Sequence, residues 1–232
     1  MDSKLKEISV HKFKNSDKLT PFAPEWNYII VDAFMSDVDC KKLSKFLLNK
    51  EKDILNIPIE TNLISDGDTG LGYNSTTSRH KTYNILDFEN EEISKIEKNI
   101  KNIHETYLKQ LNIDLPKELY AQCWVNIMRK NEQIKQHTHS TDSSSYLSGH
   151  ITVQAEKTCT HYINTNISNT VDPLYDFPVA NKIGNITLFK EVMPHYTDVH
   201  LGNSERITLA FDLSPLKEQL TGTWKKLYEK KI

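Results

Sequence analysis

Short apolar runs separated by polar turns fill the second half of the chain. After Pro116 these runs are rich in β-branched and aromatic side chains, which is typical of strands. We predict five strands, at 120–128, 147–154, 158–163, 186–189 and 206–213. Several short strands at this spacing favour a sandwich or jelly roll over a parallel α/β sheet.

The first half of the chain shows helical spacing instead. Apolar residues three and four positions apart form one stripe: Ile93, Ile96, Ile100, Ile103 and Tyr107. This stripe predicts an amphipathic helix over 91–111. Ser36 with Asp39 three residues later is a helix-start signature, so a second helix is expected from there, and a strand is expected at 26–31. The fold class is therefore mainly β with flanking helices.

Two further segments complete the predicted organisation. Residues 66–74 hold three of the seven glycines, which indicates a flexible loop and a candidate lid. The lysine-rich tail after Pro215 has apolar residues that fit one amphipathic helix. We expect a single domain in three parts: an N-terminal strand, helices and loop at 1–115, a jelly-roll core at 116–214 and a tail at 215–232.

Composition and charge exclude several classes of protein. A length of 232 residues suits one domain, and a formal net charge of −2 gives no overall attraction to nucleic acid or to an anionic membrane. No apolar run is long enough to span a membrane, and the first residues lack the apolar core of a signal peptide. The three cysteines are widely spaced, which argues against a disulfide framework. We therefore expect an intracellular, cytoplasmic protein.

Candidate chemistry gathers at three histidines and one arginine. In an extended segment His137 and His139 point to the same side, and His195 is a possible third imidazole for one metal. Three imidazoles suit iron, zinc, copper or nickel equally well. Strand alternation puts Arg206 and Thr208 on one face, where a guanidinium beside a hydroxyl suits a carboxylate. The plainer interpretation of Arg206 is a surface charge paired with Glu205 or Asp198.

Several segments together resemble the iron(II)- and 2-oxoglutarate-dependent oxygenases, in particular a small branch common in marine phages and bacteria. The matching segments are Trp124-Val125-Asn126-Ile127, His137-Thr138-His139, Leu147-Ser148-Gly149, 184–189, Pro194-His195 and 205–211. The resemblance covers about residues 75–214. Its most specific part is the spacing from His195 to Arg206 together with the strand that follows.

This resemblance implies a double-stranded β-helix in which His137 and His195 bind Fe(II). It also implies that Arg206, helped by Thr208, holds the distal carboxylate of 2-oxoglutarate. Asn126 shares a strand face with Trp124 and is expected to line the same cavity. The implied reaction is the hydroxylation of an unidentified substrate, with O2 and 2-oxoglutarate as co-substrates and succinate and CO2 released.

Position 139 departs from the usual pattern of this superfamily, which places Asp or Glu two residues after the first histidine. Three interpretations follow. His139 is the third ligand, which we favour; or Asp142 reaches the metal from the loop, although it has the wrong phase for a rigid strand; or neither binds and a coordination position stays open.

Two other functions fit the residues. One is a three-histidine, cupin-like dioxygenase or isomerase that does not use 2-oxoglutarate, in which Arg206 binds a substrate carboxylate. The other is a non-enzymatic jelly-roll binding module. No basic patch interleaved with aromatic residues points to nucleic acid. The substrate and the oligomeric state are not readable from the sequence, and His150 and His200 are interpreted as structural or exposed.

Overall fold

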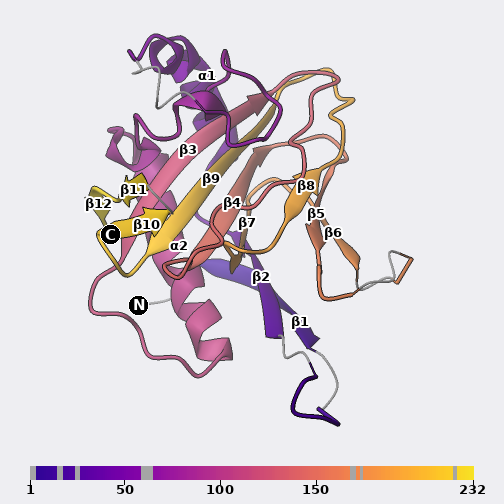
Figure 1. Ribbon diagram of the computed structural model, residues 1–232. Helices are drawn as coiled ribbons and strands as arrows, with labels where there is room; N and C mark the ends of the chain where they lie inside the picture. The colour runs from indigo at the N-terminus through magenta and orange to yellow at the C-terminus, as the bar shows by residue number, and fades with distance from the viewer. Residues whose placement is uncertain are drawn as a thin grey trace.

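The computed structural model describes residues 4–14, 18–23, 27–58, 65–167, 171–172, 175–221 and 224–232. Its largest element is a seven-stranded antiparallel sheet with strand order β1-β2-β7-β4-β9-β3-β12 (Figure 1). Those strands are β1 Leu5–Lys14, β2 Asn27–Met35, β3 Tyr120–Met128, β4 Leu147–Gln154, β7 Asn185–Lys190, β9 Arg206–Ser214 and β12 Lys230–Lys231. The fold is mainly β with flanking helices, as the sequence predicts.

A second, smaller sheet stands beside the large one (Figure 1). It has the order β6-β5-β8, with β5 at Cys159–Ile163, β6 at Asp176–Ala180 and β8 at His195–Thr197. Residues of β5 and β8 and residues of β3, β4 and β9 line one common cavity. The two antiparallel sheets are consistent with the predicted jelly-roll core, and they enclose the candidate site between them.

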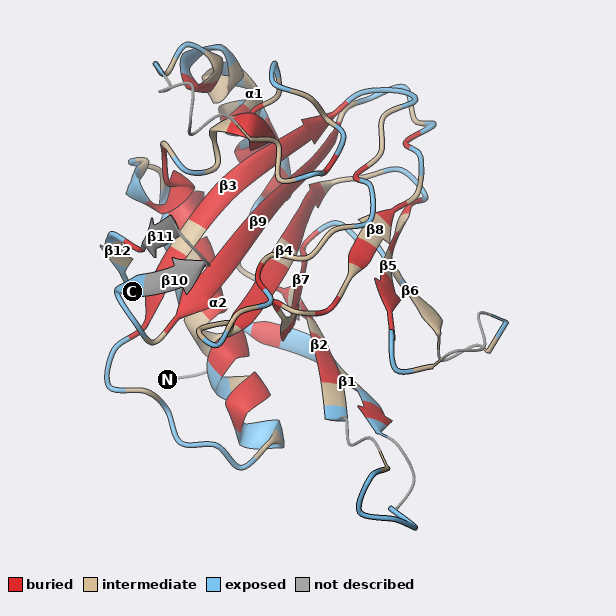
Figure 2. Cartoon of the chain, in the orientation of Figure 1, coloured by how far each residue is buried: buried red, intermediate tan, exposed pale blue. Residues whose placement is uncertain are grey.

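The other face of the large sheet is covered by two helices, α1 Cys40–Leu55 and α2 Glu91–Gln110. The predicted apolar stripe of α2 is completely buried there, in one cluster with Ile207, Leu209 and Phe211 of β9. Figure 2 shows the buried positions running along β3, β9 and α2. Short 3-10 turns at Thr77–Arg79 and Ile85–Asp87 precede α2.

The predicted helix start at Ser36 is wrong by one turn. Asp39 caps α1, because its carboxylate accepts hydrogen bonds from the backbone N–H groups of Lys41 and Lys42. The hydroxyl of Ser36 instead donates to the carbonyl oxygen of Lys4 on the neighbouring strand. The expected strand at 26–31 corresponds to β2, and residue 26 itself lies outside the described residues.

The predicted helix in the C-terminal tail is also wrong. Residues Glu218–Thr221 (β10) pair with Trp224–Leu227 (β11), and β12 then pairs with the start of β3. The backbone N–H of Ile232 donates to the carbonyl oxygen of Leu119, which adds to this edge. Pairing at the open edge of a sheet satisfies backbone groups of the tail that a helix would satisfy internally. Within the described residues, neither helix is long and apolar enough to cross a membrane.

Candidate metal centre and carboxylate pocket

Three imidazoles meet at the cavity because two short segments run side by side. The backbone N–H of His137 donates to the carbonyl oxygen of His195 at 3.1 Å, and that of His195 donates back at 3.0 Å. Two residues on, the N–H of His139 donates to the carbonyl oxygen of Glu191. His137 forms an isolated bridge with His195 and is not part of a longer strand, and His195 opens β8. The candidate ligand nitrogens of the three histidines all lie within 4.8 Å of one another.

Each of these rings has its Nδ1 anchored by an oxygen. His137 Nδ1 donates to the carbonyl oxygen of Lys135 at 2.8 Å, and His195 Nδ1 donates to that of Met193 at 3.1 Å. His139 Nδ1 donates to the carboxylate of Asp212. Because a carbonyl oxygen only accepts, the proton of a neutral ring sits on Nδ1 and leaves a lone pair on Nε2. Three such Nε2 atoms form a donor set that suits a transition metal.

Burial keeps two of these rings neutral. Desolvation, helped by the neighbouring His139, lowers the pKa of His137 to about 4. Burial together with His137 and His139 holds the pKa of His195 well below its ordinary value. Neutral imidazole is the form that binds metal ions. No proton therefore has to leave these two rings before a metal binds at neutral pH.

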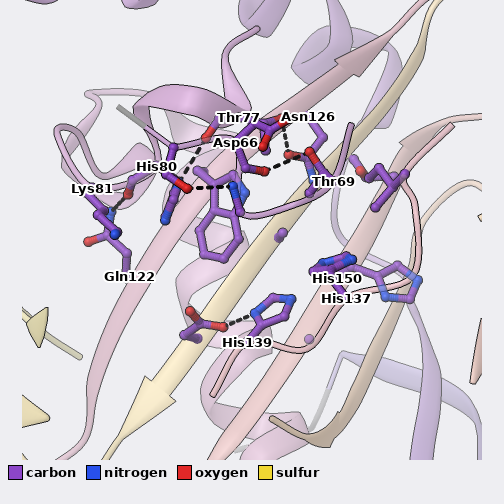
Figure 3. A pocket seen from close by; sticks show the side chains of 18 of the residues that line it. Asp66, Thr69, Thr77, His80, Lys81, Gln122, Asn126, His137, His139 and His150 are labelled. Atoms are coloured by element: carbon purple, nitrogen blue, oxygen red, sulfur yellow. Dashed lines mark hydrogen bonds and ion pairs between the residues drawn. The ribbon is translucent and has the colours of Figure 1, made fainter. Parts of the chain in front are cut away.

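A cavity of about 950 Å³ lies over the polar face of the large sheet. Its floor follows from the pairing of β3 with β9, which sets lining residues of the two strands opposite one another: Asn126 with Thr208, Trp124 with Ala210, and Gln122 with Asp212. Arg206, opposite Met128 in this register, also lines the cavity. Figure 3 shows Gln122, Asn126, His137, His139 and His150 around this pocket. Trp124 and Asn126 both line this cavity, as expected from the strand face that they share.

Arg206 is the most unusual group in this cavity, because its side chain is only 1% exposed. Nη1 donates to the sulfur of Met128 at 3.2 Å, Nε has no acceptor, and no carboxylate of the described residues forms an ion pair with it. Burial lowers its pKa to about 10. The interpretation of Arg206 as a surface charge paired with Glu205 or Asp198 is therefore wrong. A buried cation without an anion is costly, and a carboxylate ligand would remove that cost.

Other polar groups stand near this arginine. Thr208 lines the cavity, and Asn126 Oδ1 beside it accepts a hydrogen bond from the hydroxyl of Thr77 at 2.6 Å. His150 also lines the cavity, contrary to our expectation, and burial lowers its pKa to about 3. His200 is fully buried and is not among the lining residues.

The glycine-rich loop forms part of the cavity wall. The carboxylate of Asp66 accepts hydrogen bonds from the backbone N–H groups of Gly70 and Gly72, which closes the loop on itself. Residues 65–69 line the cavity, and the carbonyl oxygen of Thr69 accepts from the N–H of Lys135, two residues before His137. The loop thus lies where a lid would lie. Opening and closing of this loop stays a prediction.

The structure brings His139, the favoured candidate, together with His137 and His195, and it adds one neighbouring residue that was not predicted from the sequence. Asp142 is not in the three-histidine group, since its carboxylate accepts from Ser140 and Ser144 in its own loop. Asp212, which bonds to His139, was overlooked. The signal was present, because alternation from Arg206 through Thr208 puts Asp212 on the same face of β9.

Comparison with known proteins agrees with this geometry. A family model described as a putative 2OG-Fe(II) oxygenase matches residues 122–212, which include all three histidines and the arginine. Residues 122–212 are thus similar to the 2OG-Fe(II) oxygenase family. No curated protein matches the chain. The family match favours a 2-oxoglutarate-dependent oxygenase over a cupin-like enzyme without 2-oxoglutarate and over a non-enzymatic module.

Solved structures of several oxygenases are similar to this chain at low identity. A 2OG-Fe(II) oxygenase family oxidoreductase from Burkholderia pseudomallei is 14% identical, with 56% of this chain and 61% of that chain covered and a TM-score of 0.42. A Pseudomonas putida prolyl-4-hydroxylase is 11% identical, with 55% and 67% covered and a TM-score of 0.43. The α-ketoglutarate-dependent carbocyclase SnoK of nogalamycin biosynthesis is 10% identical, with 80% and 79% covered and a TM-score of 0.48.

Fe(II) and 2-oxoglutarate are the cofactors of this oxygenase family, and the residues present fit both. Three imidazoles with available Nε2 atoms suit the metal. A buried guanidinium without an anionic partner among the described residues suits a dicarboxylate. Both features line the same cavity.

Proposed function

We propose that this oxygenase hydroxylates a C–H bond of a small or side-chain substrate. In this proposal His137, His139 and His195 hold Fe(II) through their Nε2 atoms, while Arg206, Thr208 and Asn126 hold 2-oxoglutarate. The observation that carries it is the buried guanidinium of Arg206, which has no ion-pair partner among the described residues, in the same cavity as three converging imidazoles.

Bound iron and 2-oxoglutarate supply an oxidant that places one atom of O2 in the product alcohol and the other in succinate, with loss of CO2. The task of the protein is to hold and orient the reactants. Arg206 gives the distal carboxylate of 2-oxoglutarate a charged, rigid partner, which fixes the direction of the molecule along the cavity. Thr208, one step along the same face of β9, supplies a hydroxyl beside it.

The spacing along β9 separates the two ends of the site. Arg206 and Asp212 are six residues apart, which is about 20 Å of extended chain. The guanidinium and the anchor of His139 are therefore at opposite ends of the floor. The ring of His139 lies 5.6 Å from that of Trp124, which is paired with Ala210 midway along the floor. The metal centre then lies between the carboxylate pocket and the part of the cavity lined by Gln122.

Aromatic rings restrict water around the imidazoles. The ring centroid of Phe189 is 4.8 Å from that of His195 in an edge-on contact, and Tyr162 packs on Phe189 at 4.9 Å. These apolar walls keep competing nucleophiles and reductants away from the reactive centre. Because Arg206 occupies one end, we place the substrate at the other end, where Gln122 and His80 line the cavity.

The experiment measures succinate formed from 2-oxoglutarate by purified protein with and without Fe(II). We expect iron-dependent turnover that His195→Ala abolishes, and a KM for 2-oxoglutarate that Arg206→Ala raises at least tenfold. Arg129→Ala is the matched control, since this exposed arginine pairs with Glu51 away from the cavity. Absence of iron-dependent turnover together with absence of 2-oxoglutarate binding in calorimetry would refute the proposal.

Hydroxylation itself is tested by product analysis. With 18O2, one labelled atom is expected in succinate and one in the substrate-derived product. Label in succinate with a ring closure, an epimerised centre or another unlabelled product would keep the oxygenase and refute the hydroxylation. Inhibition by N-oxalylglycine, an analogue of 2-oxoglutarate, is expected to compete with the co-substrate.

A further inference from the structure

Behind His139 lies a buried carboxylate that the proposed reaction does not yet use. Asp212 is 2% exposed, and its Oδ1 accepts both from His139 Nδ1 and from the hydroxyl of Ser148 at 2.6 Å. Ser148 is fully buried, and it faces Asp212 directly in the pairing of β4 with β9. The carboxylate is thus held in place from two sides.

The three imidazoles differ in what anchors them. His137 and His195 donate to backbone carbonyl oxygens, which carry no net charge. His139 donates to a carboxylate, and such a charge-assisted bond is roughly twice as strong as a neutral one. An imidazole bonded to a carboxylate through one nitrogen is also a more basic ligand through the other. The charged anchor therefore stands at the one position where the superfamily usually has a carboxylate ligand.

We propose that Asp212 is a positioning residue that aims His139 Nε2 at the metal and places a negative charge one imidazole away from it. This inference rests on the proposed function, because it needs a metal on the three histidines. The superfamily usually has a carboxylate that binds the metal directly at position 139. Here His139 takes that position, and the carboxylate of Asp212 bonds to its Nδ1. A carboxylate charge then acts on the metal through the imidazole of His139.

The surroundings of Asp212 support this role. Tyr228 of the C-terminal tail is fully buried, and Asp212 and Glu191 are among the charges that raise its pKa beyond the effect of burial. The tail thus packs near Asp212 and keeps water away from the His139 pair. With little water to screen it, the charge of Asp212 acts on the imidazole more strongly than it would at the surface.

The test is the binding of Co(II) to the metal-free protein. Calorimetry measures the affinity, and the visible absorption of the bound ion reports its surroundings. Asp212→Asn keeps the shape of the side chain and an acceptor oxygen but removes the charge. We expect Co(II) to bind about 10- to 100-fold more weakly, with an altered absorption spectrum. Asp176→Asn is the matched control, because Asp176 accepts from Nδ1 of His161 at 2.9 Å in the same way but away from the cavity. That variant is expected to bind Co(II) like the wild type.

A double-mutant cycle separates positioning from a structural role. If Asp212 acts through His139, then Asp212→Asn adds no further loss of Co(II) affinity in a His139→Ala background. Should Asp212→Asn fail to fold, Ser148→Ala serves instead, since it keeps the charge but removes one of the two bonds that hold it. We expect a several-fold loss of affinity that His139→Ala again suppresses.

The outcomes distinguish this inference from the proposed function. Wild-type affinity in Asp212→Asn, or an equal loss with and without His139, overturns the role of Asp212. If the wild type itself does not bind Co(II), or if His137→Ala binds it undiminished, the proposed metal centre fails first.

Discussion

Replacing Arg206 by Met is expected to stabilise the cofactor-free protein while removing 2-oxoglutarate binding. The cost of burying this guanidinium is visible in its pKa, which burial lowers to about 10. A lowering of that size corresponds to about 3 kcal/mol, since tenfold in a protonation equilibrium is about 1.4 kcal/mol. The sign follows from linkage: the folded state binds the proton less tightly than the unfolded state, so the charged form destabilises the fold at neutral pH.

The net gain is smaller than this cost, because the substitution also removes the hydrogen bond to the sulfur of Met128. Counting that bond at about 1 kcal/mol leaves about 2 kcal/mol. For a chain of this size, such a gain raises the melting temperature by about 4–8 °C. Methionine suits the site because its flexible side chain fills an irregular apolar space.

Thermal unfolding with and without 2-oxoglutarate, in the presence of Co(II), measures both effects. The wild type is expected to gain about 2.7 kcal/mol from ligand at one hundred times its Kd, and Arg206→Met to gain nothing. Arg129→Met, at an exposed ion pair, is the control and should change stability by about 0.5 kcal/mol at most. A cofactor-free Arg206→Met protein that melts below the wild type would refute the reasoning, because the arginine would then be a stabilising part of the fold.

Three other predictions concern the scaffold. A Cβ at Gly149 would lie 2.3 Å from the ring of Phe211, so Gly149→Ala should lower the free energy of unfolding by about 1–3 kcal/mol. An unchanged midpoint of urea unfolding would contradict this close packing. Burial lowers the pKa of His104 to about 4, so the free energy of unfolding should fall as the pH drops from about 6.5 towards 4. His104→Gln should flatten this pH dependence, and an equally steep dependence in that variant would contradict the prediction. Asp39→Ala removes the cap of α1 and should cost about 1 kcal/mol, whereas a neutral result would favour another cap.

Much of the fold was predictable because local patterns and tertiary packing agree. In β9 the alternation of apolar and polar residues gives one face to the core and the other to the cavity. The same argument brings Arg206 and Thr208 into one pocket before any coordinates are known. The apolar stripe of α2 is equally direct, because one buried face of a helix needs nothing beyond its own periodicity.

Other features depend on neighbours that are distant in the sequence. The tail of the chain has the apolar residues of a helix, yet the edge of β3 offers open backbone groups that its last residues pair with. The sequence offers both Ser36 and Asp39 as caps for α1. Asp39 caps the helix, and the hydroxyl of Ser36 donates to the carbonyl oxygen of Lys4 next to β1. Asp212 gains its significance only from His139, 73 residues away, and no local pattern encodes that contact.

The two-sided character of β9 has a consequence for how this protein can change. Strand β9 contributes Ile207, Leu209 and Phe211 to the hydrophobic core. Its alternate residues Arg206, Thr208 and Asp212 line the cavity. A slip of one residue against β3 or β4 would exchange these two sets at once. An insertion within this strand is therefore expected to disturb the core and the candidate site together, whereas changes in the loops that line the cavity would leave this register intact.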